Sequence, residues 1–168
     1  MGLLGELFGK KQYPVVTTIL PIAATMEIEA GRLPILNTDK LFLKKGEKIH
    51  YIDKAINLEI KTVKSYAHIG RSVPGILQGN RWNAGIAKPL ESTEMVQHRG
   101  ILYLTNQRIV FQAPEWGYDK GFSTLTAVTP YVDACELQFG NKSYNMIVPD
   151  GNLLYEALQL IKQRRQGP

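Results

Sequence analysis

The sequence predicts a mainly β protein of the α+β class, with a curved antiparallel sheet or barrel closed by a C-terminal amphipathic helix. Residues 100–111 read as a tight β-hairpin with one wholly apolar face. Residues 150–165 place apolar side chains on one helical stripe behind Asp150, a residue type that caps helices. At 168 residues and 44% hydrophobic content, the chain fits one domain with additional segments at its edge.

The hairpin register follows from a two-residue turn at Asn106 and Gln107. Cross-strand partners point to the same side of a sheet, which sorts the side chains into two faces. The apolar face carries Leu102, Leu104, Ile109 and Phe111. The other face carries Tyr103, Thr105, Arg108 and Val110, and we expect it to meet solvent or a partner.

The polar residues beside the turn have a structural interpretation. A Thr105 hydroxyl in this position bonds local backbone, and Arg108 caps a carbonyl or pairs with a carboxylate. Gly100 marks a bend or bulge where the strand enters the hairpin. The hairpin therefore identifies the fold and is not expected to be the binding site.

The pattern Gly-x-Leu-x-Leu-Thr-x-x-Arg-x-x-Phe at residues 100–111 resembles the signature of GRAM and bacterial pleckstrin-homology-like domains, which include uncharacterised members. Expected strands at 122–128, 134–139 and 142–148, and the last helix, extend the likeness over residues 37–164. It implies a pleckstrin-homology-like sheet with basic residues on its first strands and loops. The chain departs from lipid-binding members in lacking a Lys-x-n-Arg-x-Arg arrangement.

Two regions are predicted, an N-terminal arm at residues 1–36 and the pleckstrin-homology/GRAM-like domain at residues 37–168. The arm begins with a short amphipathic helix that could bind a membrane, a protein partner or its own domain. Its candidate contact residues are Leu3, Leu4, Leu7, Phe8, Lys10 and Lys11. Three prolines and Gly31 favour an extended path over residues 12–36 with short strands or a single turn of helix, and residues 26–29 alternate as an edge strand would.

The first half of the domain reads as β structure. Residues 41–43 are expected to pack under the first strand. Residues 47–58 and 60–68 suggest an antiparallel strand pair. Short glycine-rich strands are expected at residues 73–78 and 81–87.

The net charge of +5 is concentrated in residues 37–92, which carry ten basic and five acidic side chains. Scattered, solvated surface lysines explain such an excess without a ligand, and an anionic partner is the alternative. The candidate residues for an anionic surface or ligand are Lys44, Lys45, Lys61, Lys64, Arg71, Arg81 and Lys88.

No motif indicates an enzyme, a metal site or a cofactor. The residues His50, His68 and His98 lack metal-ligand spacing, and neither a phosphate-binding Gly-Lys-Ser/Thr loop nor a Gly-x-Ser-x-Gly motif occurs. A single cysteine, Cys135, suits a reducing compartment and a buried position. The longest apolar run is interrupted by Pro21 and is too short to span a membrane. We therefore expect a cytoplasmic protein that could associate peripherally with a membrane.

Two functional hypotheses follow. In the first, a non-enzymatic binding or adaptor module docks on protein partners or an anionic membrane surface, with self-association into a homo-oligomer as a further expectation. In the second, a β-barrel binds nucleic acid through Tyr66, Arg71, Arg81 and Trp82, residue types that stack on bases and neutralise phosphates.

Overall fold

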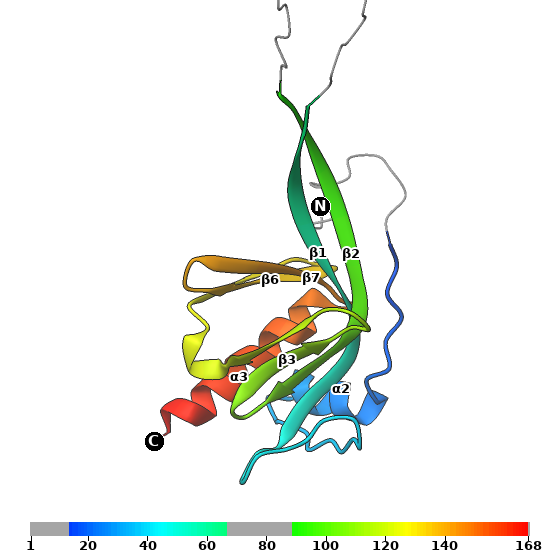
Figure 1. Cartoon of the computed structure of the whole chain (residues 1–168). Coiled ribbons are helices and arrows are strands. Elements are labelled where there is room, and N and C mark those ends of the chain that lie inside the picture. Colours follow the sequence, from blue (N-terminus) through cyan, green and yellow to red (C-terminus); the bar gives the residue numbers. More distant parts are fainter. Residues whose placement is uncertain (1–13, 67–88, 168) are drawn as a thin grey trace, which may run out of the picture. The chain divides into compact units, whose positions relative to one another are not determined.

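The computed structural model describes residues 14–66 and 89–167. Seven strands form one antiparallel sheet in the order β4-β3-β2-β1-β7-β6-β5 (Figure 1). The strands are β1 (Ile49–Tyr66), β2 (Pro89–Thr105), β3 (Arg108–Gln112), β4 (Gly117–Gly121), β5 (Ala127–Pro130), β6 (Ala134–Phe139) and β7 (Lys142–Ile147). The helices are α2 (Ile22–Glu29), the 3-10 turn η1 (Phe122–Thr124) and α3 (Gly151–Gln166).

The chain divides into two compact units. The first comprises residues up to Glu59 and from Gln97 onward, and the second comprises Ile60–Val96. In the second unit the described residues belong to the outer parts of β1 and β2. The first unit contains the hydrophobic core.

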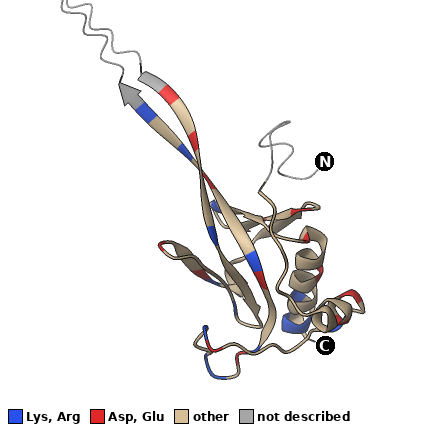
Figure 2. Ribbon diagram, turned by 90° about the vertical axis from the view of Figure 1, so that its right-hand side faces the viewer, with Lys and Arg blue, Asp and Glu red and all other residues tan. Residues whose placement is uncertain are grey.

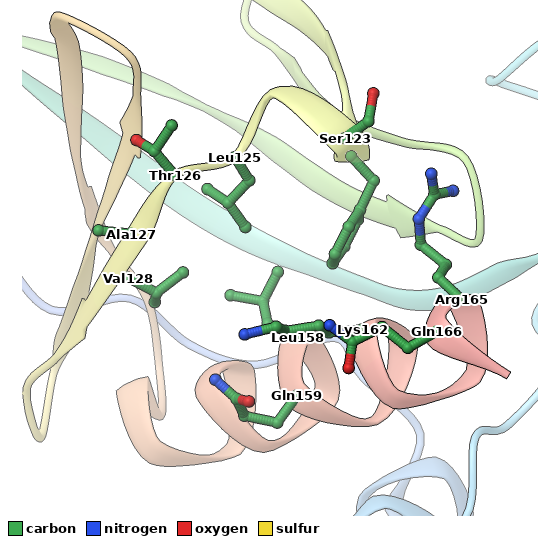
Figure 3. Close-up of a pocket in the computed structure, with 11 residues that line it drawn as sticks. Ser123, Leu125, Thr126, Ala127, Val128, Leu158, Gln159, Lys162, Arg165 and Gln166 are labelled. Atoms are coloured by element: carbon green, nitrogen blue, oxygen red, sulfur yellow. The ribbon is translucent and has the colours of Figure 1, made fainter. Parts of the chain in front are cut away.

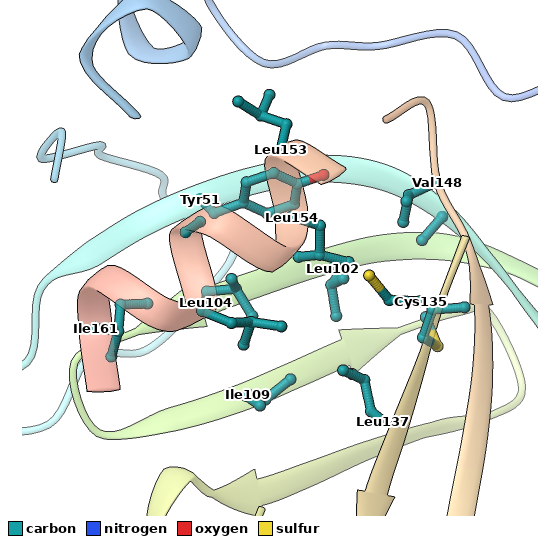
Figure 4. Packing of buried hydrophobic residues seen from close by; sticks show 14 of the residues in the cluster. Tyr51, Leu102, Leu104, Ile109, Cys135, Leu137, Val148, Leu153, Leu154 and Ile161 are labelled. Atoms are coloured by element: carbon teal, nitrogen blue, oxygen red, sulfur yellow. The ribbon is translucent and has the colours of Figure 1, made fainter. Parts of the chain in front are cut away.

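The core of the first unit lies between the sheet and α3 (Figure 4). The helix begins after Asp150, whose side chain accepts a 3.0 Å hydrogen bond from the backbone of Leu153. Its buried side chains are Leu153, Leu154, Ala157, Leu158 and Ile161. A mainly β fold with a curved antiparallel sheet and a C-terminal helix is thus confirmed, including the capping residue.

The predicted register of the β2–β3 hairpin is also confirmed. Leu102 faces Phe111, Tyr103 faces Val110 and Leu104 faces Ile109. Gly100 has a steric reason to be glycine, since a Cβ atom there would lie 2.0 Å from the carbonyl oxygen of Gln112. Cys135 is fully buried, as predicted for a small apolar side chain.

The prediction for the second face of the hairpin was wrong. Tyr103, Thr105, Arg108 and Val110 are all buried. The segment that precedes β1 covers this face, and Leu41 packs there with Ile49, Tyr103 and Val110 in a second apolar cluster. The covering residues are too distant in sequence for strand alternation to reveal them.

Several predicted elements differ from the observed ones. Residues 26–29 belong to helix α2 instead of an edge strand, because Ala24 and Ile28, four residues apart, bury the same helical face. The two strands predicted at 47–58 and 60–68 are replaced by one long strand, β1, over Ile49–Tyr66, and residues 67 and 68 lie outside the described residues. The expected strand at 122–128 is η1 followed by β5, and β4 was not predicted. The glycine-rich strands predicted at 73–78 and 81–87 lie outside the described residues.

Candidate functional site

The β2–β3 turn holds a surface loop that we call the Phe42 loop, residues 39–46. The loop precedes β1 and reaches the turn through side chains of Asn106, Gln107 and Arg108. Glu47, which follows the loop, lies buried against the same turn. The turn residues therefore position a segment about sixty positions earlier in the chain.

Arg108 is the centre of this arrangement. Its Nε donates to Oε1 of Glu47 at 2.8 Å, and its Nη1 donates to the carboxylate of Asp119 on β4. Its Nη2 donates to the carbonyl oxygen of Phe42 at 2.7 Å. The Thr105 hydroxyl donates to Glu47 at 2.8 Å and accepts from the backbone N–H of Arg108 at 2.9 Å. The structural role predicted for Thr105 and Arg108 is confirmed.

These contacts favour the ionised form of both partners. Burial raises the pKa of Glu47, but hydrogen bonds from Arg108, the Lys44 backbone and Thr105, with the charge of Arg108, outweigh it and lower the pKa overall. The hydrogen bond to Glu47 raises the pKa of Arg108 against the effect of burial. Arg108 and Glu47 therefore form a buried, charged ion pair, which we call the Arg108 clamp because it holds the Phe42 loop against the β2–β3 turn.

Hydrogen bonds hold the backbone of the Phe42 loop at four of its residues, which are Phe42, Lys44, Lys45 and Gly46. Besides the Phe42 carbonyl, the N–H of Lys44 donates to Glu47 at 2.7 Å. The carbonyl of Lys45 accepts from the Gln107 side chain at 3.1 Å, and that of Gly46 accepts from Asn106 at 3.1 Å. Gly46 has a φ of 73°, a left-handed conformation that glycine adopts without strain.

The side chains on this fixed backbone point into solvent. Phe42 is 92% exposed and Leu43 is 43% exposed, whereas Leu41 beside them is 7% exposed. Lys40, Lys44 and Lys45 are exposed. The prediction that residues 41–43 pack under the first strand holds for Leu41 only. The loop therefore presents an exposed aromatic side chain beside exposed lysines, which makes it a candidate interaction site.

A hollow of about 410 Å³ lies beside the loop, between the start of β1, the β2–β3 turn and the last turn of α3. We call it the cationic pocket. Its lining includes Lys48, His50, Arg164 and Arg165, together with Leu33, Gly46, Asn106 and Ile161. Figure 2 shows the basic residues on the loop and at the C-terminal end of α3.

A second hollow of about 350 Å³ lies between η1, β5 and the outer side of α3 (Figure 3). Leu125, Val128 and Leu158 supply its apolar wall, and Lys162 and Arg165 lie at its edge. The Arg165 guanidinium also lies 5.6 Å from the centre of the Phe122 ring. Arg165 thus borders both hollows.

The structure brings together only some of the residues predicted from sequence. Lys44 and Lys45 are neighbours on the Phe42 loop. Lys61 and Lys64 are exposed in the second unit. Outside the described residues lie Arg71, Arg81 and Lys88, and the arm residues Leu3, Leu4, Leu7, Phe8, Lys10 and Lys11.

Sequence reasoning missed the apolar part of the site and the contribution of α3. The adjacency of Phe42 and Leu43 to Lys44 and Lys45 was the available signal for the loop. Nothing local links Lys48 or His50 with Arg164, because folding of the sheet against α3 creates that proximity.

The described residues contain no helix with the length and apolar character required to cross a bilayer. Within the same residues, no group of three or more His, Cys, Asp or Glu side chains is arranged to hold a metal ion.

Comparison with known proteins adds little to these observations. The sequence matches no protein-family model and no curated protein. Among solved structures, the chain is similar to the Vps36 N-terminal PH domain, with 15% sequence identity and a TM-score of 0.44. The alignment covers 80% of this chain and 93% of that domain.

Proposed function

We propose that this protein is a binding module that docks on an anionic membrane surface through the Phe42 loop. The observation that carries the proposal is the exposure of Phe42 and Leu43 beside three exposed lysines on a backbone fixed by Arg108 and its neighbours. Aromatic and leucine side chains enter the interfacial region of a bilayer, and lysines beside them remain near anionic headgroups. The loop has both properties within four consecutive residues.

The expected affinity is modest. Complete burial of an exposed aromatic side chain contributes about 2–3 kcal/mol, and the half-exposed Leu43 contributes less. Each lysine near an anionic surface adds about 1 kcal/mol, and Asp39 at the start of the loop offsets one of them. The sum, about 5 kcal/mol, corresponds to binding weaker than micromolar. Such docking is reversible and requires anionic lipid.

Fixation of the loop supports this interpretation. A flexible loop would lose conformational freedom on binding, at a cost of about 1–2 kcal/mol for each residue ordered. The hydrogen bonds at Phe42, Lys44, Lys45 and Gly46 order the backbone before any contact is made. Most of the small binding energy is then available for affinity.

The test is co-sedimentation with phosphatidylcholine vesicles, with and without phosphatidylserine. Binding is expected only with phosphatidylserine and is expected to weaken steeply with salt. Phe42→Ser should lower the partition coefficient about tenfold or more, and the double change Lys44→Gln with Lys45→Gln should have a similar effect.

Matched controls separate the loop from the rest of the surface. Val132→Ser removes another exposed apolar side chain, and Lys54→Gln with Lys142→Gln removes the same charge from exposed positions on β1 and β7. Both controls should bind like the parent protein. Equal losses in control and loop variants would refute a localised docking site. A third outcome is that the protein does not bind vesicles but binds a protein partner or a second copy of itself, and that Phe42→Ser abolishes this binding. The Phe42 loop would then be a docking site for that partner and not for a membrane.

The nucleic-acid alternative stays a prediction, since Arg71, Arg81 and Trp82 lie outside the described residues. The same variants test it with a single-stranded oligonucleotide. Oligonucleotide binding that weakens steeply with salt, with the same affinity in Phe42→Ser and Val132→Ser as in the parent, would favour nucleic acid over the membrane.

A further inference from the structure

We propose that the cationic pocket binds a phosphate group. The pocket is formed by residues from three separate parts of the chain, at the start of β1, at the β2–β3 turn and at the end of α3. This inference goes beyond the proposed function, because it rests on the geometry of the pocket and would hold for a soluble ligand as well.

The first argument is uncompensated charge. Lys48, Arg164 and Arg165 all line the pocket, and no carboxylate is among the described residues that line it. Within the described part of the chain, these three side chains form no ion pair. The carbonyl groups at the end of α3 supply only about half a negative charge. Three cationic side chains that line one hollow therefore exceed the local negative charge and favour an anion.

The second argument is the state of His50. The side chain is 3% exposed, and its Nδ1 lies 2.7 Å from the carbonyl oxygen of Pro34. Because a carbonyl only accepts, Nδ1 carries a proton. Nε2 has no hydrogen-bond partner among the described residues. This nitrogen is not among the buried atoms that lack a partner, and His50 lines the pocket, so a ligand in the pocket can reach it.

The third argument is donor geometry. Arg165 already donates from Nη1 to the carbonyl of Asn106 at 2.7 Å, which fixes its guanidinium at the edge of the pocket. Arg164 and Lys48 have no side-chain hydrogen bond within the described residues, so their donors are available. A tetrahedral phosphate can accept from several cationic donors at once, and its P–OH group can donate to a neutral His50.

The probe is inorganic phosphate, titrated into the full chain at constant ionic strength set with sodium chloride. The readouts are calorimetry and the imidazole nitrogen signals of His50, assigned with the variant His50→Gln. Saturable binding is expected, and phosphate should shift the His50 titration to higher pH. Arg164→Gln and Lys48→Gln should each weaken binding about tenfold or more, as expected for loss of a charged hydrogen bond.

The matched control is Lys162→Gln, which removes the same charge from the same helix but outside the pocket. It should leave phosphate affinity within about twofold, since Lys162 does not line the pocket and supplies no hydrogen-bond donor to it. Absence of saturable phosphate binding, or equal losses in Lys162→Gln and Arg164→Gln, would overturn the proposal.

Vesicles identify the source of the phosphate. Phosphatidic acid presents a phosphate monoester, and phosphatidylserine vesicles are matched to it in surface potential. Preference for phosphatidic acid that Arg164→Gln abolishes supports the pocket and assigns a lipid headgroup. Saturable inorganic phosphate binding without this preference supports the pocket and assigns a soluble phosphate compound. Phe42→Ser should not alter phosphate binding in solution, so failure of membrane docking and failure of the pocket are distinguishable.

Discussion

The guanidinium of Arg108 donates a 2.7 Å hydrogen bond to the backbone carbonyl of Phe42, whose side chain is the most exposed large apolar one among the described residues. The other donors of Arg108 bond Glu47 and Asp119. One buried cation thus connects strand β3, strand β4 and the Phe42 loop. A residue beside a hairpin turn stabilises the fold and also determines the conformation of the candidate binding loop.

Removal of Arg108 should destabilise the protein. Arg108→Met leaves Glu47 buried without its partner, and loss of one member of a buried pair costs about 3–5 kcal/mol. Urea unfolding measures the change. Addition of Glu47→Gln should recover part of the loss, because the uncompensated charge is then absent. An Arg108→Met protein as stable as the parent would contradict the clamp.

The Glu47 carboxylate should contribute to acid sensitivity. Its pKa in the folded protein is lower than its ordinary value of 4.5, so the unfolded chain binds more protons as the pH falls. The stabilisation is complete above about pH 4.5 and is lost as the pH falls through the folded pKa. In urea unfolding from pH 7 to pH 3, the free energy of unfolding should fall less steeply for Glu47→Gln than for the parent. Identical profiles would exclude Glu47 as a source of this dependence.

Adjacent residues of the loop should behave in opposite ways. Leu41 is buried with Ile49, Tyr103 and Val110, so Leu41→Ala should lower the free energy of unfolding by about 2–3 kcal/mol. Phe42 is 92% exposed, and Phe42→Ser should change the free energy of unfolding by less than about 0.5 kcal/mol. Thermal unfolding of both variants checks the contrast. Similar losses for the two would mean that Phe42 is packed in solution.

The His50 imidazole should give a second, milder pH dependence. Burial lowers its pKa below the ordinary 6.5, the Pro34 hydrogen bond opposes this, and the charges of Arg164 and Lys48 lower it further. The unfolded state then binds more protons below about pH 6.5, and stability should decline from there as the pH falls toward the folded pKa. Denaturation between pH 7.5 and pH 5 should show this slope in the parent and not in His50→Gln. A slope that persists in His50→Gln would assign it to another group.

Local patterns predicted the parts of the fold that depend on near neighbours. The register of residues 102–111 and the cap at Asp150 follow from strand alternation and helix geometry over a few residues. The burial of Arg108 and the meeting of Lys48 with Arg164 depend on segments far apart in the chain, which no short pattern encodes. Strand β4 was missed because its five residues begin and end with glycine, a weak strand signal.

Gly100 and Gly121 differ in the space that a Cβ atom would find. A Cβ atom at Gly100 would lie 2.0 Å from the backbone oxygen of Gln112, so Gly100→Ala requires the β2–β3 pair to separate locally. At Gly121 the nearest atom to a Cβ is Ser123 Oγ at 3.7 Å, and the φ of −55° suits any residue. Thermal unfolding should therefore show a large loss for Gly100→Ala, about 2 kcal/mol or more, as for other overpacked sites. Gly121→Ala should be neutral or stabilise by up to about 1 kcal/mol, because alanine restricts the unfolded chain. Equal stability of the two variants would show that strands β2 and β3 do not approach as closely at Gly100 as the structure indicates.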